Sequence, residues 1–184
     1  STDEKLKELE KRNRDLNEES RKLAEEIRKR YEDLKKEHED LLREIEKRLR
    51  DLMREVERKD VPEKDLEELK EDARRLREEL RRHHEEIERH IRESEKELRR
   101  IEDEHRKEDE KVKKELKDVR ERDLDEKSVD DVIRRWEELL EELRRRNEEA
   151  VRRMERNIDE LRRNVRETID RVRKLLEEIK RKVD

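Results

Sequence analysis

The sequence contains no glycine, no cysteine and no phenylalanine, and it has only one proline, one tryptophan and one tyrosine. The lack of cysteine excludes a disulfide framework and gives no redox clue to compartment. The lack of glycine excludes a Gly-rich loop that could supply an oxyanion hole. No apolar run approaches the roughly 20 residues of a membrane span, and no signal peptide is visible. We therefore expect no membrane partner, and the localisation stays unknown.

What is present instead is charge. Charged residues make up 65% of the 184 residues and hydrophobic residues 26%, a balance that usually indicates disorder. Here 57 basic residues stand against 62 acidic ones, so the chain does not strongly repel itself. Most residues are also strong helix formers, and this composition is typical of long helices or coiled coils. The net charge of −5 and the interleaving of arginines with acidic residues argue against a nucleic-acid partner, which needs a sustained basic surface.

Two interruptions break the helical pattern. In "RKDVPEKDLEEL", Asp60 can cap a helix and Pro62 suits a first turn. In "RERDLDEKSVDDVI", Ser128 followed by Asp131 resembles a capping box with Asp in place of Glu. The pattern predicts three helices, at residues 3–59, 63–121 and 128–183.

The apolar spacing within these segments repeats every 18 residues. In the first helix, Asn13, Tyr31 and Leu49 are equivalent, and the second and third helices repeat in the same way. Eighteen residues in five turns is the period of an undistorted α-helix, so the helices should be nearly straight. Because both connections are short, neighbouring helices should run antiparallel. We predict an all-α, elongated, antiparallel up-down-up three-helix bundle, with one domain over residues 1–184 and helices about 85 Å long.

Several positions on the inward-facing lines are polar. They are Asn13, Ser20, His38, His83, Ser94, His105, Asn147 and Thr168, with Asn157 at the edge. A buried polar group without a partner costs a few kcal/mol, so these groups should meet one another.

The two turns set a register that sorts the polar positions into three layers. The first layer holds Asn13, Asn17, Ser20, His105, Asp109 and Asn147; the second holds Ser94 and Asn157; the third holds His38, Thr168 and either His83 or His84. We infer three transverse hydrogen-bond networks, which can fix register and topology even when they add little stability.

Taken together, the equal helices, the repeat, the missing glycine and cysteine, the charged surface and the layered polar core resemble de novo designed helical bundles with buried hydrogen-bond networks. The resemblance covers the whole chain and depends on these shared features rather than on a motif. It implies a structural scaffold with no natural biochemical activity, no catalytic or cofactor-binding residues and no required partner. Such a bundle is expected to be a monomer.

The histidine-rich stretch "RRHHEEIERH" at 81–90 raises two further hypotheses, a metal site and catalysis. His83 and His90 lie about 10.5 Å apart along a helix, and the stretch does not match HExxH. We expect His83 in a network, His84 at its boundary and His90 at the surface, with no metal and no cofactor. A packed three-helix core is also expected to offer no substrate cleft, so the chain should not be an enzyme.

An alternative function is a coiled-coil interaction or spacer protein that self-associates or binds partner helices. Pairs of consecutive apolar residues at 139–140, 150–151 and 175–176 widen the apolar face of the third helix. This wider face slightly favours the interaction or spacer function. Finally, His38, His83 and His105, if buried as neutral partners, should have depressed pKa values and make the fold acid-sensitive. His38 and His83 are the cleaner test, because Asp109 could pair with a charged His105.

Overall fold

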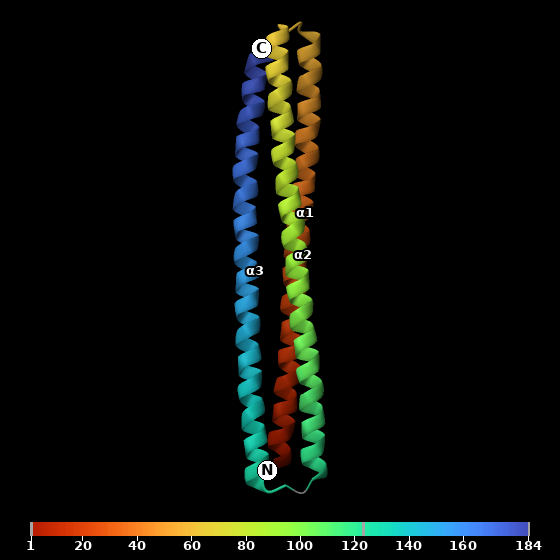
Figure 1. The fold of residues 1–184 in the computed structure, drawn as a ribbon, viewed down its shortest axis with the longest axis vertical. Helices are drawn as coiled ribbons and strands as arrows, with labels where there is room; N and C mark the ends of the chain where they lie inside the picture. The colour runs from red at the N-terminus through yellow and green to blue at the C-terminus, as the bar shows by residue number, and fades with distance from the viewer. Residues whose placement is uncertain (1, 123, 184) are drawn as a thin grey trace. The chain divides into compact units, whose positions relative to one another are not determined.

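The computed structural model describes residues 2–122 and 124–183. It consists of three α-helices, α1 (Thr2–Arg58), α2 (Glu63–Glu121) and α3 (Glu126–Val183), packed as an antiparallel bundle (Figure 1). The predicted fold class is confirmed. The helix bounds agree closely with the prediction, except that α3 begins two residues earlier than expected.

The connection between α1 and α2 differs in detail from the prediction. The carbonyl of Pro62 accepts the first helical hydrogen bond of α2, from Leu66 N at 3.0 Å. Pro62 therefore occupies the N-cap position that was expected for Asp60. Asp60 instead has a φ of 50°, the left-handed conformation in which many helices end. Its place is at the end of α1, where aspartate tolerates that conformation better than most residues do.

The start of α3 is capped by Asp125, and the predicted Ser128 cap is wrong. Asp125 Oδ1 accepts a hydrogen bond from Ser128 N at 3.2 Å, and its carbonyl accepts one from Val129 N at 3.2 Å. These are the bonds of an N-cap residue. The hydrogen bonds from Ser128 lower the pKa of the Asp125 carboxyl.

The residue contacts divide the chain into two compact units, each containing part of all three helices. The first unit comprises Ser1–Lys29 and Glu93–Glu155, and the second comprises Arg30–Arg92 and Arg156–Asp184. The single domain expected over 1–184 stays a prediction, and each unit is described by itself.

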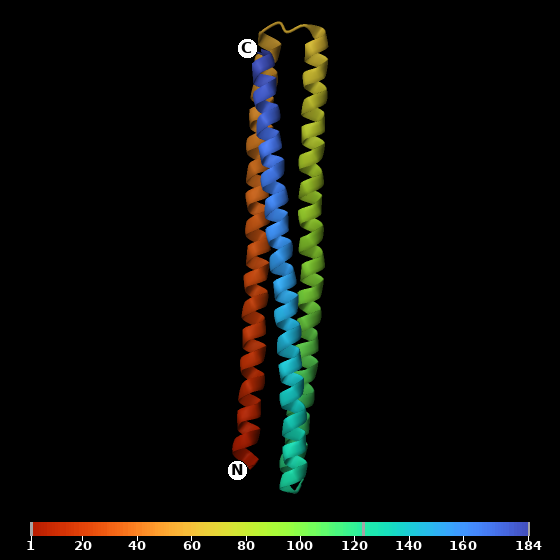
Figure 2. The same ribbon diagram turned by 90° about the vertical axis from the view of Figure 1, so that its left-hand side faces the viewer.

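The first unit contains the described start of α1 beside the α2–α3 connection, as both views show (Figures 1 and 2). Its core includes an apolar cluster to which all three helices contribute. The members are Leu6, Leu9, Leu16, Val112, Leu116, Val119, Val129, Val132, Ile133, Trp136, Leu140 and Leu143. Leu139, half of a doubled pair, packs against this cluster.

The second unit contains the end of α3 beside the α1–α2 connection (Figures 1 and 2). Its cluster again draws on all three helices and comprises Ile45, Leu49, Val56, Leu69, Ala73, Leu76, Leu80, Val172, Leu176 and Ile179. Leu175 packs against it. Across the described chain, the one large hydrophobic side chain classed as exposed is Leu124, at 40%.

Ion pairs join neighbouring helices within each unit. In the first unit, Arg120 of α2 lies 2.8 Å from Glu10 of α1. In the second unit, Arg171 of α3 lies 3.0 Å from Glu79 of α2. Pairs of this kind flank the apolar clusters and are consistent with antiparallel pairing, although partly exposed ion pairs contribute little stability individually.

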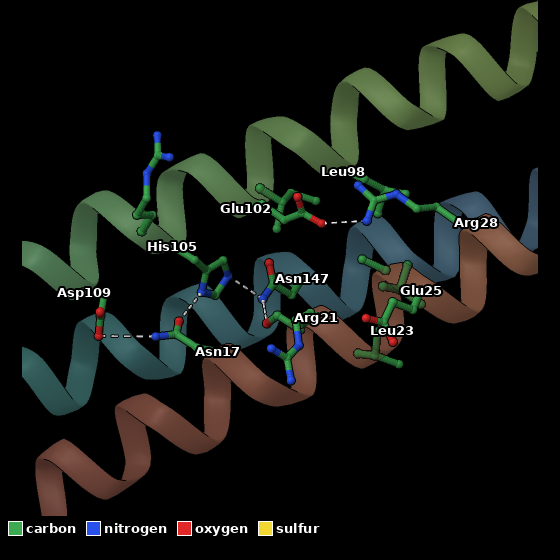
Figure 3. A pocket seen from close by; sticks show the side chains of 15 residues that line it. Asn17, Arg21, Leu23, Glu25, Arg28, Leu98, Glu102, His105, Asp109 and Asn147 are labelled. Carbon is green, nitrogen blue, oxygen red and sulfur yellow. Dashed lines mark hydrogen bonds and ion pairs between the residues drawn. The ribbon is translucent and has the colours of Figure 1, made fainter.

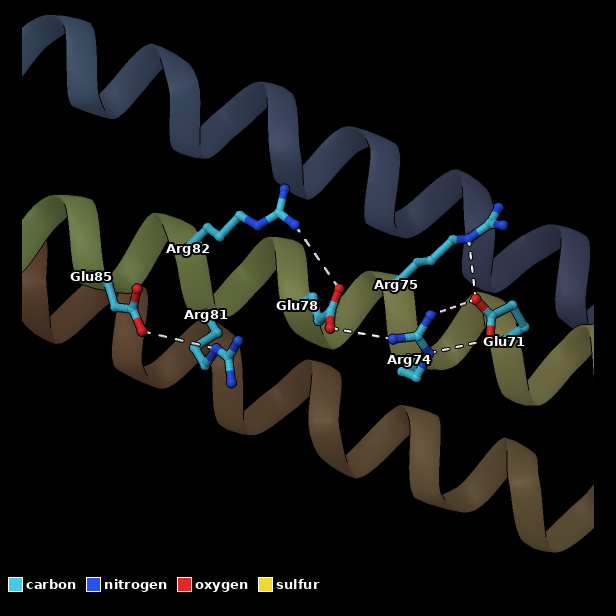
Figure 4. Close-up of polar contacts among 7 residues, drawn as sticks. All are labelled: Glu71, Arg74, Arg75, Glu78, Arg81, Arg82 and Glu85. Carbon is cyan, nitrogen blue, oxygen red and sulfur yellow. Dashed lines mark hydrogen bonds and ion pairs between the residues drawn. The ribbon is translucent and has the colours of Figure 1, made fainter.

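The exposed face of α2 in the second unit has a ladder of ion pairs between residues three and four apart (Figure 4). Arg74 lies 2.7 Å from Glu71 and 3.3 Å from Glu78. The hydrogen bond from Arg74 lowers the pKa of Glu71. This spacing places opposite charges side by side on a helix and explains how so polar a sequence remains helical.

Candidate functional site

The first polar layer joins all three helices within the first unit. Asn147 on α3 donates a hydrogen bond from Nδ2 to Ser20 Oγ on α1, at 2.6 Å. The same Nδ2 lies 2.6 Å from His105 Nε2 on α2. Asn147 therefore bridges the other two helices through one amide nitrogen, from which two dashed lines run in Figure 3.

These contacts determine which ring nitrogen of His105 carries the hydrogen. Because the Asn147 amide donates, Nε2 of the neutral ring must accept, and the hydrogen resides on Nδ1. Nδ1 then donates to Asn17 Oδ1, at 3.2 Å. The direction of each bond in the layer follows from this tautomer.

The layer ends at the carboxylate of Asp109. Its Oδ1 accepts hydrogen bonds from Asn13 Nδ2 and from Asn17 Nδ2, the latter at 3.3 Å. Its Oδ2 lies 2.9 Å from Lys113 Nζ. The donors are thus oriented towards a single anion, which a nearby cation balances.

The predicted members of this layer lie together. Asn13, His105 and Asn147 are buried, and Ser20 is half-buried. Ser20 does not bond His105 directly, because Asn147 lies between them.

Asn17 and Asp109 complete the layer, where the register of the two turns had placed them, although they were not among the inward-facing polar positions named from the pattern. Each lies one helical turn from a predicted member, Asn17 from Asn13 and Asp109 from His105. Residues four apart share a helix face, so that spacing was the available signal. Their side chains reach the layer from its partly exposed edge.

The two residues of the second predicted layer belong to different units. Ser94 is buried in the first unit, whereas Asn157 is half-buried in the second. The pairing of these two residues stays a prediction.

The third layer, in the second unit, brings together α2 and α3. Thr168 is buried and donates its hydroxyl hydrogen to the backbone carbonyl of Asn164, at 2.9 Å. Its Oγ1 lies 2.7 Å from His83 Nε2. Since the threonine hydrogen is already used, His83 must donate from Nε2.

His38 does not join that hydrogen-bond network. It is buried, and its ring stacks on His84, with centroids 5.6 Å apart and an interplanar angle of 16°. Among the described residues, Nδ1 of neither ring has a hydrogen-bond partner. Burial, reinforced by repulsion from His84 and His83, lowers the pKa of His38 to about 4.

The other two histidines of the stretch at 81–90 are both half-buried. His84 is half-buried, as expected of a boundary residue, and it contacts Glu88 at 3.1 Å as well as stacking on His38. His90, expected at the surface, is half-buried, with Nε2 4.0 Å from Glu86. Within residues 2–122 and 124–183, no group of three or more His, Cys, Asp or Glu side chains is arranged to hold a metal ion.

The expectation that the core offers no cleft is wrong. A groove of about 540 Å³ lies beside the first polar layer (Figure 3). We call it the Ala24 groove; its lining residues are Asn17, Ser20, Arg21, Leu23, Ala24, Glu25, Arg28, Leu98, Ile101, Glu102, His105, Arg106, Asp109, Asn147 and Val151.

Comparison with known proteins was made at the level of families, sequences and structures. No family model, curated protein or solved structure matches this chain. None of the described helices is both long enough and apolar enough to cross a membrane. The function therefore has to be argued from the bundle itself and its buried polar groups.

Proposed function

We propose that the chain is a designed structural scaffold whose buried polar layers specify the topology of the helices. The observation that carries the proposal is the first layer, where Asn147 bonds partners on both other helices and His105 continues the chain of bonds to Asn17. The 18-residue repeat supports it, because a sequence so regular otherwise allows several alignments of the same apolar lines.

The physical role of the layer is to penalise wrong alignments. Leucine and isoleucine positions that repeat every 18 residues can be matched after one helix slides past another. Such a slip would leave His105 and Asn147 in apolar surroundings without hydrogen-bond partners. Each lost partner would lower the stability of the misaligned bundle by about 1–3 kcal/mol. A buried polar residue that fixes register is the best-attested use of such groups.

The test replaces Asn13, Asn17, Ser20, His105 and Asn147 together by leucine or isoleucine. Stability to chemical denaturation should be retained or increased, because a satisfied network is exchanged for apolar packing. The register should loosen, which hydrogen exchange and sedimentation would report as faster amide exchange or as aggregation.

The matched control replaces five exposed glutamates of the first unit by glutamine, at positions outside the layer. It should leave both exchange and sedimentation unchanged. A network-free variant that remains a single well-ordered monomer would show that the layer does not specify topology.

A second candidate, a spacer that self-associates or binds partner helices, is favoured by the widened stripe of α3. Against it, Leu139 and Leu175 pack against the two core clusters and Ala150 is buried. Sedimentation at two concentrations separates the candidates, since a scaffold should remain a monomer at both. A mass that rises with concentration would favour the second candidate.

A further inference from the structure

The Ala24 groove exists because several of its lining residues are smaller than their equivalents in the 18-residue repeat. Ala24 stands where the repeat places Leu6 and Leu42. Val151 similarly stands where the repeat places Ile133 and Ile169. Small side chains at these positions leave space that the apolar line fills elsewhere, and the volume of about 540 Å³ is within the usual range of small-molecule sites.

Two polar atoms at the floor of the groove are available to a ligand. Asn147 uses Nδ2 for Ser20 and His105, and the described network makes no use of its carbonyl Oδ1. Figure 3 shows that oxygen on the side of Asn147 facing Glu102. Ser20 accepts from Asn147, which leaves its hydroxyl hydrogen free to donate. The groove thus presents one acceptor, on Asn147, and one donor, on Ser20.

The charges around the groove cancel. Three arginines and three carboxylates line it. One of the arginines, Arg28, is already paired with two carboxylates. Arg28 lies 2.9 Å from Glu102 and 2.9 Å from Glu95, and its hydrogen bond to Glu95 raises its pKa. A balanced rim gives no net attraction for an anion or a cation, so it favours a neutral ligand.

The remaining wall is apolar. Leu98 and Ala24 are buried, and Leu23, Ile101 and Val151 are half-buried. A flat ring gives the greatest apolar contact in a groove between two helices while few rotatable bonds have to be immobilised. The other described grooves are lined mainly by charged side chains.

We propose that the Ala24 groove is a binding site for a neutral aromatic alcohol. The ligand's hydroxyl group donates to Asn147 Oδ1 and accepts from the Ser20 hydroxyl, while its ring packs against Leu98 and Ile101. One hydroxyl group satisfies both open atoms of the floor, which neither a plain hydrocarbon nor an ether can do.

The test titrates the full chain, labelled with ¹⁵N, with 2-naphthol, and follows the amide shifts together with the heat of binding. Saturable binding with Kd below about 1 mM should shift amides at 20–28, 98–106 and 147–151. The ether 2-methoxynaphthalene, which lacks the O–H donor, should bind about three to ten times more weakly, as expected for one lost hydrogen bond. Shifts centred elsewhere, no saturation, or equal affinity for the ether would each overturn the proposal.

Variants give an independent check. Ala24→Leu restores the side chain that the repeat places at 6 and 42 and should abolish binding. Ser20→Ala should weaken binding about threefold to tenfold. Leu52→Phe adds apolar bulk to a groove in the second unit and should leave binding unchanged. Undiminished binding by a folded Ala24→Leu variant would exclude this groove as the site.

Discussion

At the scale of single residues, the polar side chains of the interior are of two kinds. Asn147 and His105 have their hydrogen-bonding needs met by partners on other helices. His38 has a different kind of contact, because it stacks on His84 and leaves Nδ1 without a bonded partner. A satisfied group and an unsatisfied one respond differently to substitution and to pH, so each supports its own prediction.

Replacing Asn147 by leucine should lower the free energy of unfolding by about 1–3 kcal/mol. The change removes the donor to both His105 and Ser20, and His105 is buried where water replaces the partner poorly. Chemical denaturation measures the loss. Asn164→Leu is a matched control on the same helix, because Asn164 serves Thr168 through its backbone carbonyl. Equal effects of the two substitutions would contradict the role given to the Asn147 side chain.

Acid should destabilise the second unit through His38. Its folded pKa of about 4 lies below the unfolded value of about 6.5, so the unfolded chain binds more protons between these pH values. Stability present above pH 6.5 is therefore lost as pH falls towards 4, by about 2 kcal/mol at pH 5 and on the order of 3 kcal/mol in total.

Chemical denaturation at pH 7.5 and pH 5 tests this prediction on the parent chain and on the His38→Leu variant. In the variant, the free energy of unfolding should lose most of its dependence on pH. His90→Leu, a half-buried histidine of the same unit, should keep it. The burial and lowered pKa of His38 are the observations that carry this prediction. A parent equally stable at both pH values would contradict the neutral, buried state of His38.

At the scale of the helix, length and straightness depend on local chemistry, and the ends depend on single residues. The spacing of opposite charges seen at Arg74 and Glu71 supports the long exposed faces. The ends are set by Asp60, Pro62 and Asp125. Ser128 was assigned to the cap from its type and spacing, but Asp125, three residues earlier, provides the same chemistry.

Replacing Asp125 by alanine should fray the first turn of α3, because the N–H of Ser128 loses its acceptor. Amide hydrogen exchange over 126–129 should become faster, and the melting temperature should fall slightly. Asp131→Ala, which removes the acidic partner in the predicted Ser128 capping box, is the control and should leave the exchange at 126–129 unchanged. The reverse result would restore the Ser128 cap.

At the scale of the whole molecule, three helices of 57, 59 and 58 residues pack as an antiparallel bundle. Each unit has its own apolar cluster. Under the proposed function, the ion pairs and the polar groups beside these clusters contribute to the alignment of the helices more than to stability.

The elongated arrangement expected from helix length is tested by small-angle scattering. Helices of this length side by side would extend for about 85 Å, whereas a compact globule of 184 residues would have a radius of gyration of about 16 Å. A radius well above that value is expected. A result near 16 Å would show that the helices do not remain continuous in solution.

The sequence by itself determined the number, length and antiparallel order of the helices, because these depend on the 3.6-residue period and on two short local breaks. It also identified the inward polar positions, including Asn13, His105 and Asn147. The tertiary structure alone decided which atoms meet: the hydrogen bonds of Asn17 to His105 and Asp109, the stacking of His84 against His38, and the space beside Ala24. Periodicity specifies the face on which a residue lies, whereas hydrogen bonds, ring stacking and cavities depend on how far side chains from other helices reach at the same level.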